Sequence, residues 1–339
     1  MIRIGIPRAL LYYQYYPMWK AFFEELGAEV VVSSTTTQAM LAEGASRVVA
    51  ETCLPVKVFL GHVFSLVGEC DRIFIPVIRS MGNKVYNCSK FLGLPDMTKA
   101  VVPEAPPILD IDIDINEGKW MLYQDIYRLG RYFTWNPVKV RQASLAAQQA
   151  YLDFRELMTG HKLTPPEVLV GMSELEASDT PAVEYEVPRH PDSMRATIAV
   201  IGHPYLLYDK YITHRLIHRL EQAGNKVLTP EMLTNEELQA GIARLAGRAY
   251  WTYEEEVTGA GEHYLQNGVD GVIGIMAFGC GPDSLMMDMV RRQAVRRRTT
   301  PFMNLTLEEH TAEAGLITRM EAFVEMIYRK KRKNVDVCV

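Results

Sequence analysis

Cysteine is scarce in this chain of 339 residues, which contains only five, and no two of them form a Cys-x-x-Cys pair. An odd number of widely spaced cysteines argues against a disulfide scaffold and favours a reducing compartment. Structural zinc sites usually need four ligands, often supplied by such pairs, so the usual signature of structural zinc is missing as well.

Long hydrophobic runs and an excess of positive charge are also lacking. No apolar run approaches the roughly 20 residues that a membrane-spanning helix needs. The chain opens on a strand-like segment, Ile2–Ile6, in place of a basic secretion signal. Lysine and arginine number 36 against 41 acidic residues, and the resulting net charge of −5 disfavours nucleic-acid binding. We therefore expect a cytoplasmic protein that binds neither membranes nor nucleic acid.

Nucleotide-binding motifs are absent from the sequence. It has neither the Gly-x-x-x-x-Gly-Lys-Ser/Thr loop of ATPases nor the Gly-x-Gly-x-x-Gly fingerprint of dinucleotide-binding folds. Any ATP hydrolysis linked to this protein is therefore expected in a partner.

What the sequence does contain is an internal repeat. The stretches IGIPRALLYYQYYPMWKAFFEELGAEVV and IGHPYLLYDKYITHRLIHRLEQAGNKVL share a strand, a Gly-x-Pro turn, a helix and a glycine before the next strand. The proline and the later glycine have the same spacing in both copies, Pro7 with Gly27 and Pro204 with Gly224. The length also exceeds the roughly 250 to 300 residues of a single core. Each half is therefore predicted to form its own β-α-β unit.

Hydrophobic periodicity predicts an α/β fold with two Rossmann-like domains, whose parallel sheets face each other across a cleft, and a helical middle segment. The predicted parts are residues 1–116, a helical segment with a proline-rich connector over 117–195, and residues 196–339 with a closing helix. Strands are predicted at Ile2–Ile6, Glu29–Ser33, Arg72–Pro76, Ile108–Ile113, Thr197–Ile201, Lys226–Thr229, Gly271–Met276 and Phe302–Leu305. Helices are predicted at Met18–Leu26, Thr37–Ala50, Pro55–Val67, Leu92–Val101, 117–160, Tyr211–Ala223, Asn235–Arg248, Ser284–Arg298 and Ala314–Lys331.

Three of the cysteines share one position in the predicted fold. Cys53, Cys88 and Cys280 each follow a strand or open the helix after it, at the sheet edge where open α/β folds bind ligands. Helix starts also stabilise thiolates and anionic clusters, and Cys280 can approach the other two if the sheets face each other. Cys70 precedes its strand and is predicted to be a packing residue. Cys338 lies in the tail and is left out of the site.

The residues alone leave three interpretations of this trio open. Three cysteines from distant segments suit an iron–sulfur cluster with one iron open to water or substrate. Core cysteines with no shared role are the simplest alternative. A zinc site is a third, although a clear fourth ligand is missing.

Other polar residues flank the cysteine-bearing turns. The basic residues at these turns are expected to balance an anionic cluster, to hold the phosphate of a ligand, or to be solvated surface charges; they are Arg8, Lys57, Arg79 and Lys90. Ser284 is expected to cap its helix rather than to bind a metal. His310 is expected to have a structural or capping role, with a place in the cleft as the alternative.

Six motifs carry a resemblance to a known family: GIPRALLYY, CLPVKVFLGHV, IFIPVIRS, CSKFLGLPD, GVDGVIGIMAFGCGPDS and PFMNLTLEEHTAEAGLITRMEAFVEM. Together they resemble the 2-hydroxyacyl-CoA dehydratase component D family, most closely its branch related to the acyl-CoA dehydratase activases. The resemblance implies paired Rossmann-like domains around an iron–sulfur cluster, anaerobic redox chemistry, and an ATP-dependent activase that delivers low-potential electrons. Matching the motifs implies Cys53, Cys88 and Cys280 as cluster ligands, and three such cysteines suit a single [4Fe-4S] cluster.

The chain departs from this family in two respects. Ser89 stands where relatives commonly have the proline of Cys-Pro-Lys-Phe, and no CoA-binding signature is recognisable. We therefore expect an iron–sulfur redox protein, either an electron carrier or a reductase- or dehydratase-like enzyme, in a homo- or heterodimer served by an activase. The alternative is a non-catalytic cluster-binding scaffold, a maturation partner, or a zinc-bound structural protein.

Overall fold

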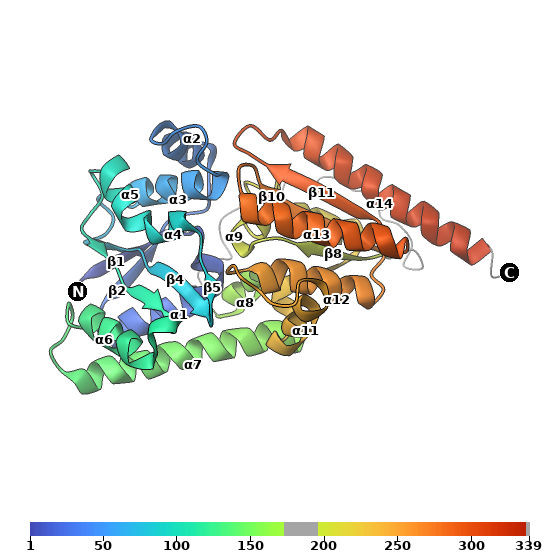
Figure 1. Cartoon of the computed structure of the whole chain (residues 1–339). Helices are drawn as coiled ribbons and strands as arrows, with labels where there is room; N and C mark the ends of the chain where they lie inside the picture. Colours follow the sequence, from blue (N-terminus) through green and yellow to red (C-terminus); the bar gives the residue numbers. More distant parts are fainter. Residues whose placement is uncertain (173–195, 337–339) are drawn as a thin grey trace. The chain divides into compact units, whose positions relative to one another are not determined.

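The computed structural model describes residues 1–172 and 196–336 and divides into two compact units, which Figure 1 colours along the sequence. Unit 1 comprises residues 1–157 and 249–252, and unit 2 comprises 158–248 and the described residues from 253 onward. Both units are α/β, as the periodicity predicts. The division between them falls within helix α7 (Pro137–His161). The predicted connector up to residue 195 lies partly outside the described residues.

Unit 1 is built on a parallel sheet with the strand order β2-β1-β3-β6. Its strands are β1 (Arg3–Ile6), β2 (Glu29–Val32), β3 (Arg72–Phe74) and β6 (Ile108–Leu109). From β1 the chain adds β2 on one side and then returns to add β3 on the other side of β1. Such a reversal creates a crevice at the carboxyl ends of the two central strands, where α/β proteins bind ligands.

Aromatic packing fixes helix α1 (Tyr12–Glu25) on this sheet. The rings of Trp19 and Phe23 meet Phe74 edge to face, with centroids 5.3 Å and 5.0 Å away. The helix starts before the predicted Met18 and contains Pro17. The prediction began after this proline because proline removes a helical hydrogen bond. The other unit 1 helices are α2 (Gln38–Ser46), α3 (Leu54–Ser65), α4 (Ser89–Leu92), α5 (Leu94–Val101), η1 (Ile115–Glu117) and α6 (Lys119–Gly130).

A second, smaller sheet extends unit 1, with the order β5-β4-β7. Strand β4 (Val77–Gly82) pairs antiparallel with β5 (Val85–Tyr86) and parallel with β7 (Asp112–Asp114). The β4–β5 hairpin is missing from the sequence prediction. The single strand predicted over Ile108–Ile113 is in fact divided between β6 and β7. The alternating isoleucines and aspartates of this stretch therefore belong to two strands, each at the edge of its own sheet.

Unit 2 repeats the topology of unit 1 with a parallel sheet in the order β9-β8-β10-β11. Its strands are β8 (Thr197–Ile201), β9 (Lys226–Leu228), β10 (Gly271–Ala277) and β11 (Phe302–Leu307). Gly27 and Gly224 follow the helices before β2 and β9 with φ angles of 85° and 84°. A left-handed residue at this position ends a helix, and glycine adopts it without strain. The internal repeat seen in the sequence is confirmed.

Helices cover both faces of the unit 2 sheet. A Cβ on Gly271 of β10 would lie 2.4 Å from Ile327, whereas one on Gly274 would lie 2.7 Å from Met287. Residues three apart in a strand point to opposite faces, so α14 (Glu313–Asp336) and α13 (Gly281–Arg297) lie on opposite sides; Figure 1 shows α13 crossing the strands and α14 beside β11. The other unit 2 helices are α8 (Pro165–Met172), α9 (Pro204–Leu207), α10 (Leu216–Gln222), η3 (Pro230–Met232), α11 (Asn235–Leu245), η4 (Glu255–Gly259) and α12 (Ala260–Gln266). Every helix within residues 1–172 and 196–336 is too short or too polar to cross a bilayer.

Candidate functional site

Cys53, Cys88 and Cys280 occupy the same local position in the fold. Each is the residue immediately before a helix: Cys53 before α3, Cys88 before α4 and Cys280 before α13. Their backbones are extended at this point, with ψ angles of 147°, 139° and 105°, and all three residues are half-buried. The predicted placement of these cysteines at helix starts is confirmed.

Unit 1 brings two of these cysteines together beside a lysine. Burial raises the pKa of the Cys53 thiol, while the Lys90 ammonium and the Val56 N–H lower it and Cys88 raises it further. Such electrostatic effects fall off quickly with distance in a solvated protein. Cys53, Cys88 and Lys90 are therefore near enough to interact electrostatically, and we call these three residues the Cys53–Cys88 site.

Cys280 lies in unit 2, where β10 ends. The Ser284 hydroxyl donates to the Cys280 carbonyl oxygen at 2.8 Å, and Asp283 in the first turn of α13 is completely buried. The expectation that Ser284 caps α13 is wrong, because the helix already begins at Gly281. In the part of the chain that the structure describes, no three His, Cys, Asp or Glu side chains gather as a metal-binding group. A site that joins Cys280 to the other two cysteines stays a prediction.

A buried histidine–aspartate pair next to Cys280 was missed by the sequence reasoning. His203 follows β8 and Asp283 follows β10, and the Nε2 of His203 lies 3.2 Å from the Oδ1 of Asp283. On its other side the His203 ring meets the Tyr205 hydroxyl, with 2.5 Å between Nδ1 and the oxygen. Burial lowers the pKa of His203 and raises that of Asp283, because a low-dielectric interior disfavours both charged forms. The available signal was that His203 lies two residues after the predicted strand Thr197–Ile201 and Asp283 seven residues after the predicted strand Gly271–Met276.

Unit 1 has a buried histidine at the corresponding sheet edge. His62 of α3 is fully buried, with Nδ1 2.8 Å from the Ser33 hydroxyl and Nε2 2.8 Å from the Thr36 hydroxyl. The Ser33 oxygen also accepts the Arg8 N–H at 2.8 Å. Burial, helped by the positive charge of Arg8, lowers the pKa of His62 to about 3. His62 is therefore a neutral ring that ties the ends of β1 and β2 to α3.

The remaining polar residues from the sequence prediction have other surroundings. The buried Lys57 donates its ammonium to the Ala50 carbonyl oxygen at 2.9 Å. Arg79 forms an ion pair with Asp112, with both Nε and Nη2 2.7 Å from a carboxylate oxygen. His310 is exposed in the turn between β11 and α14. Among the four basic residues predicted to flank the cysteines, Lys90 acts on Cys53.

Cys70 is confirmed as a packing residue. It is buried before β3, and a Cβ on Gly5 would lie only 2.5 Å from its sulfur. Burial raises the pKa of its thiol to about 11. A protonated thiol at the amino edge of the sheet is a poor metal ligand.

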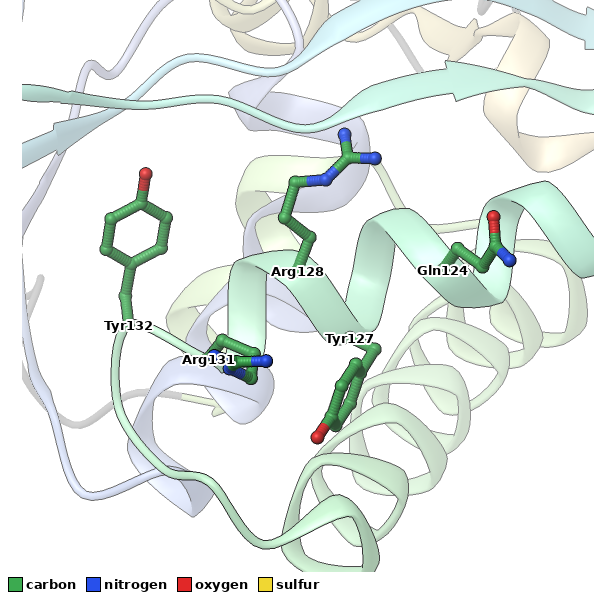
Figure 2. Close-up of a pocket in the computed structure, with 5 residues that line it drawn as sticks. All are labelled: Gln124, Tyr127, Arg128, Arg131 and Tyr132. Atoms are coloured by element: carbon green, nitrogen blue, oxygen red, sulfur yellow. The ribbon is translucent and has the colours of Figure 1, made fainter.

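A separate open hollow of about 480 Å³ lies at the end of α6 and is lined by Gln124, Tyr127, Arg128, Arg131 and Tyr132. Figure 2 shows these side chains spread around the helix rather than converging on one point. Arg128 pairs with Asp125 at 2.9 Å, and Arg131 lies 3.5 Å from the centre of the Trp135 ring. Because its two cations already have partners, we assign no ligand to this hollow.

The comparisons with known proteins give one family. The model of the family described as CoA enzyme activase uncharacterised domain (DUF2229) matches residues 3–233. No curated protein matches the chain. The matched range includes Cys53 and Cys88 and ends before Cys280. Its description fits the activase-related branch that the sequence motifs resemble, whereas the resemblance to component D itself stays a prediction. Because the match covers more than half of the sequence, the chain belongs to the CoA enzyme activase uncharacterised domain family.

Proposed function

We propose that this protein is the iron–sulfur-binding member of a dehydratase–activase system, related to component D, and accepts low-potential electrons from a separate ATP-dependent activase. The observation that carries the proposal is the Cys53–Cys88 site, where two thiols and the Lys90 ammonium are near enough to interact electrostatically. Family membership supports the choice of system. The missing ATPase loop supports the assignment of ATP hydrolysis to the partner.

The side chains at the Cys53–Cys88 site suit an iron–sulfur cluster. Cysteine thiolates are the usual ligands of such clusters, and a nearby ammonium offsets the negative charge that several thiolates and sulfides bring together. We propose Cys53, Cys88 and Cys280 as ligands of one [4Fe-4S] cluster, with Lys90 balancing its charge and Ser284 fixing the backbone of Cys280. When bound, the cluster would supply one-electron chemistry for a reduction or a radical dehydration.

The shared position of the three cysteines favours one centre over unrelated thiols. Cys280 precedes α13 just as Cys53 precedes α3, and both helices carry proline in their first turn. The N–H groups of the first helical turn have no partner within the helix, so a proline there costs no hydrogen bond. Its fixed φ angle also favours the start of the helix. We propose that this arrangement holds the Cys53 and Cys280 thiols in place before any metal binds. A homo- or heterodimer is the expected functional unit.

Electron delivery tests the proposal. Full-length protein purified without oxygen is mixed with an activase of the 2-hydroxyacyl-CoA dehydratase type and a low-potential reductant, with and without ATP. We expect the EPR signal of a reduced cluster to appear when ATP is present and to be absent with a non-hydrolysable ATP analogue.

Two results would contradict this function. Zinc in place of iron in the anaerobic protein would point to a structural site. An iron–sulfur cluster whose reduction ignores both activase and ATP would point to a scaffold or maturation partner.

A further inference from the structure

Unit 2 contains a hollow of about 490 Å³ that none of the cysteines lines. It lies between α8, the turn that links α9 to α10, and α10 itself, and Val170, Leu207 and Ile217 form an apolar wall. Pockets for small ligands commonly measure about 300 to 1,000 Å³ and combine apolar walls with a few polar groups. The hollow therefore has the size and the lining of a small-molecule site.

The positively and negatively charged side chains that line this hollow lie at different ends of it. Arg215 directly precedes α10, and His218 and Glu221 lie three residues apart within it, so these two share one helix face. All three line the hollow. The pKa of His218 is lowered by burial and by the positive charges of Arg215 and Lys210. The pKa of Glu221 is raised by burial and by the negative charge of Glu167 on α8. One end of the hollow is therefore basic and the other acidic.

The basic end is built on backbone that side-chain-bearing residues rarely adopt. His214 and Arg215 have φ angles of 48° and 59°. The turn is held in this shape by Asp209, whose carboxylate accepts two backbone N–H groups at 2.9 Å and 3.1 Å. The Nε of Arg219 also donates to the His214 carbonyl oxygen at 2.8 Å. Left-handed backbone of this kind persists where the surroundings fix it, and it is common at ligand sites.

We propose that this hollow binds a small zwitterion, with a carboxylate at one end, an amine at the other and a short apolar chain between them. The carboxylate pairs with Arg215 and Lys210, and the amine pairs with Glu221 and Glu167. The five steps from Leu216 to Glu221 rise about 7.5 Å along α10, and Arg215 lies one residue beyond that end of the helix. An extended ω-amino acid of five or six carbons fits that separation. This site goes beyond the proposed function and does not depend on the cysteines.

Calorimetric titration of the full-length protein tests the proposal with 6-aminohexanoate as the probe. Hexanoate, which lacks the amine, and hexylamine, which lacks the carboxylate, serve as matched ligands. We expect 6-aminohexanoate to bind about fivefold or more tightly than either, since each exposed ion pair adds a factor of about two to five.

Single substitutions locate the two ends of the ligand. Arg215→Gln and Glu221→Gln should each weaken 6-aminohexanoate binding about two- to fivefold. Glu221→Gln should leave hexanoate binding no weaker, and Arg215→Gln should do the same for hexylamine. The controls are Lys226→Gln and Glu321→Gln, which change exposed charges that do not line the hollow and should leave all affinities unchanged.

Lys210→Gln provides a second variant at the basic end if Arg215→Gln fails to fold, as judged by its circular dichroism. Three results would overturn the proposal. They are no detectable binding of 6-aminohexanoate, equal affinity for hexanoate and 6-aminohexanoate, or unchanged affinity in the folded Lys210 and Glu221 variants.

Discussion

The Nε2 of His203 lies 3.2 Å from the Oδ1 of Asp283 inside unit 2, although 80 positions separate the two residues in the sequence. Both side chains are almost fully buried, with 4% and 0% of their residue surfaces exposed. The parallel pairing of β8 with β10 brings their carboxyl ends together, and the pair forms there. Because Asp283 lies in the first turn of α13, this pair ties the start of that helix to the end of β8.

Substitution of Asp283 distinguishes a neutral pair from an ionised one. Burial drives both His203 and Asp283 toward their neutral forms. We expect Asp283→Asn, which keeps the shape and remains neutral, to cost less than about 1 kcal/mol of unfolding free energy. Asp283→Ala should cost about 2 to 4 kcal/mol, because it opens a cavity and removes the neighbour of His203. Urea unfolding measures both; an Asn variant as unstable as the Ala variant would indicate an ionised pair.

The pH dependence of stability tests the environment of His62. Its pKa is lowered from 6.5 to about 3 in the folded protein, so between these values the unfolded chain binds the proton and the native state does not. Stability contributed by this group is therefore lost as the pH falls below 6.5. The loss amounts to about 1.5 kcal/mol between pH 6.5 and about pH 5.

The His62→Gln variant supplies the control for this pH dependence. It removes the titrating ring and should show a shallower fall in unfolding free energy over the same pH range, measured by urea unfolding. Equal slopes for the wild type and the variant would show that His62 is not a buried neutral ring.

The topology of the fold could be predicted from the repeat, but several elements could not. The Pro–Gly spacing predicted two β-α-β units, and the structure gives both units the same strand order. The β4–β5 hairpin escaped prediction because its strands are short and lack a clear period. The sequence does not predict the first half of α1, because Pro17 disfavours a helix there. The helix forms because the burial of Tyr12 and Tyr13 outweighs the destabilisation that one proline causes. Tertiary packing of this kind is not visible in local sequence patterns.

The candidate site could be predicted only in part, because the partners of its side chains depend on tertiary packing. The position of Cys280 follows from the rule that parallel strands end at one edge of a sheet. Cys88 instead follows the antiparallel strand β5, and Cys53 lies between α2 and α3. The pairing of His203 with Asp283 depends on which two strands are neighbours, and no local pattern specifies that. The partners of Lys57 and Arg79 likewise depend on side-chain packing.

Alkylation of Cys53 tests its contact with Lys90. The Lys90 ammonium lowers the pKa of this thiol against the raising effect of burial. In protein kept metal-free by a chelator, Lys90→Gln should slow iodoacetamide modification of Cys53 roughly threefold or more, because less thiolate is present. Rates are followed by mass spectrometry at one pH. Lys99→Gln, an exposed lysine paired with Asp96, should leave the rate unchanged; an unchanged rate in Lys90→Gln would place Lys90 away from Cys53.

Close helix packing in unit 1 predicts a large effect from one added methyl group. A Cβ on Gly61 of α3 would lie 2.0 Å from the Met40 carbonyl oxygen of α2. Gly61→Ala should therefore lower the unfolding free energy by more than about 2 kcal/mol. Gly160→Ala is the matched control, because nothing lies within 4 Å of a Cβ there; it should raise stability by about 0.5 to 1 kcal/mol. A mild Gly61→Ala variant would contradict the close crossing of α2 and α3.

Iron and acid-labile sulfide per chain, measured in protein purified without oxygen, test the central claim most directly. The wild type should contain about four of each, as one [4Fe-4S] cluster requires. Cys53→Ala, Cys88→Ala and Cys280→Ala should each lose most of both, whereas Cys70→Ala, at the packing cysteine, should keep them. A wild type without iron, or a Cys280→Ala variant with its iron and sulfide intact, would contradict the account.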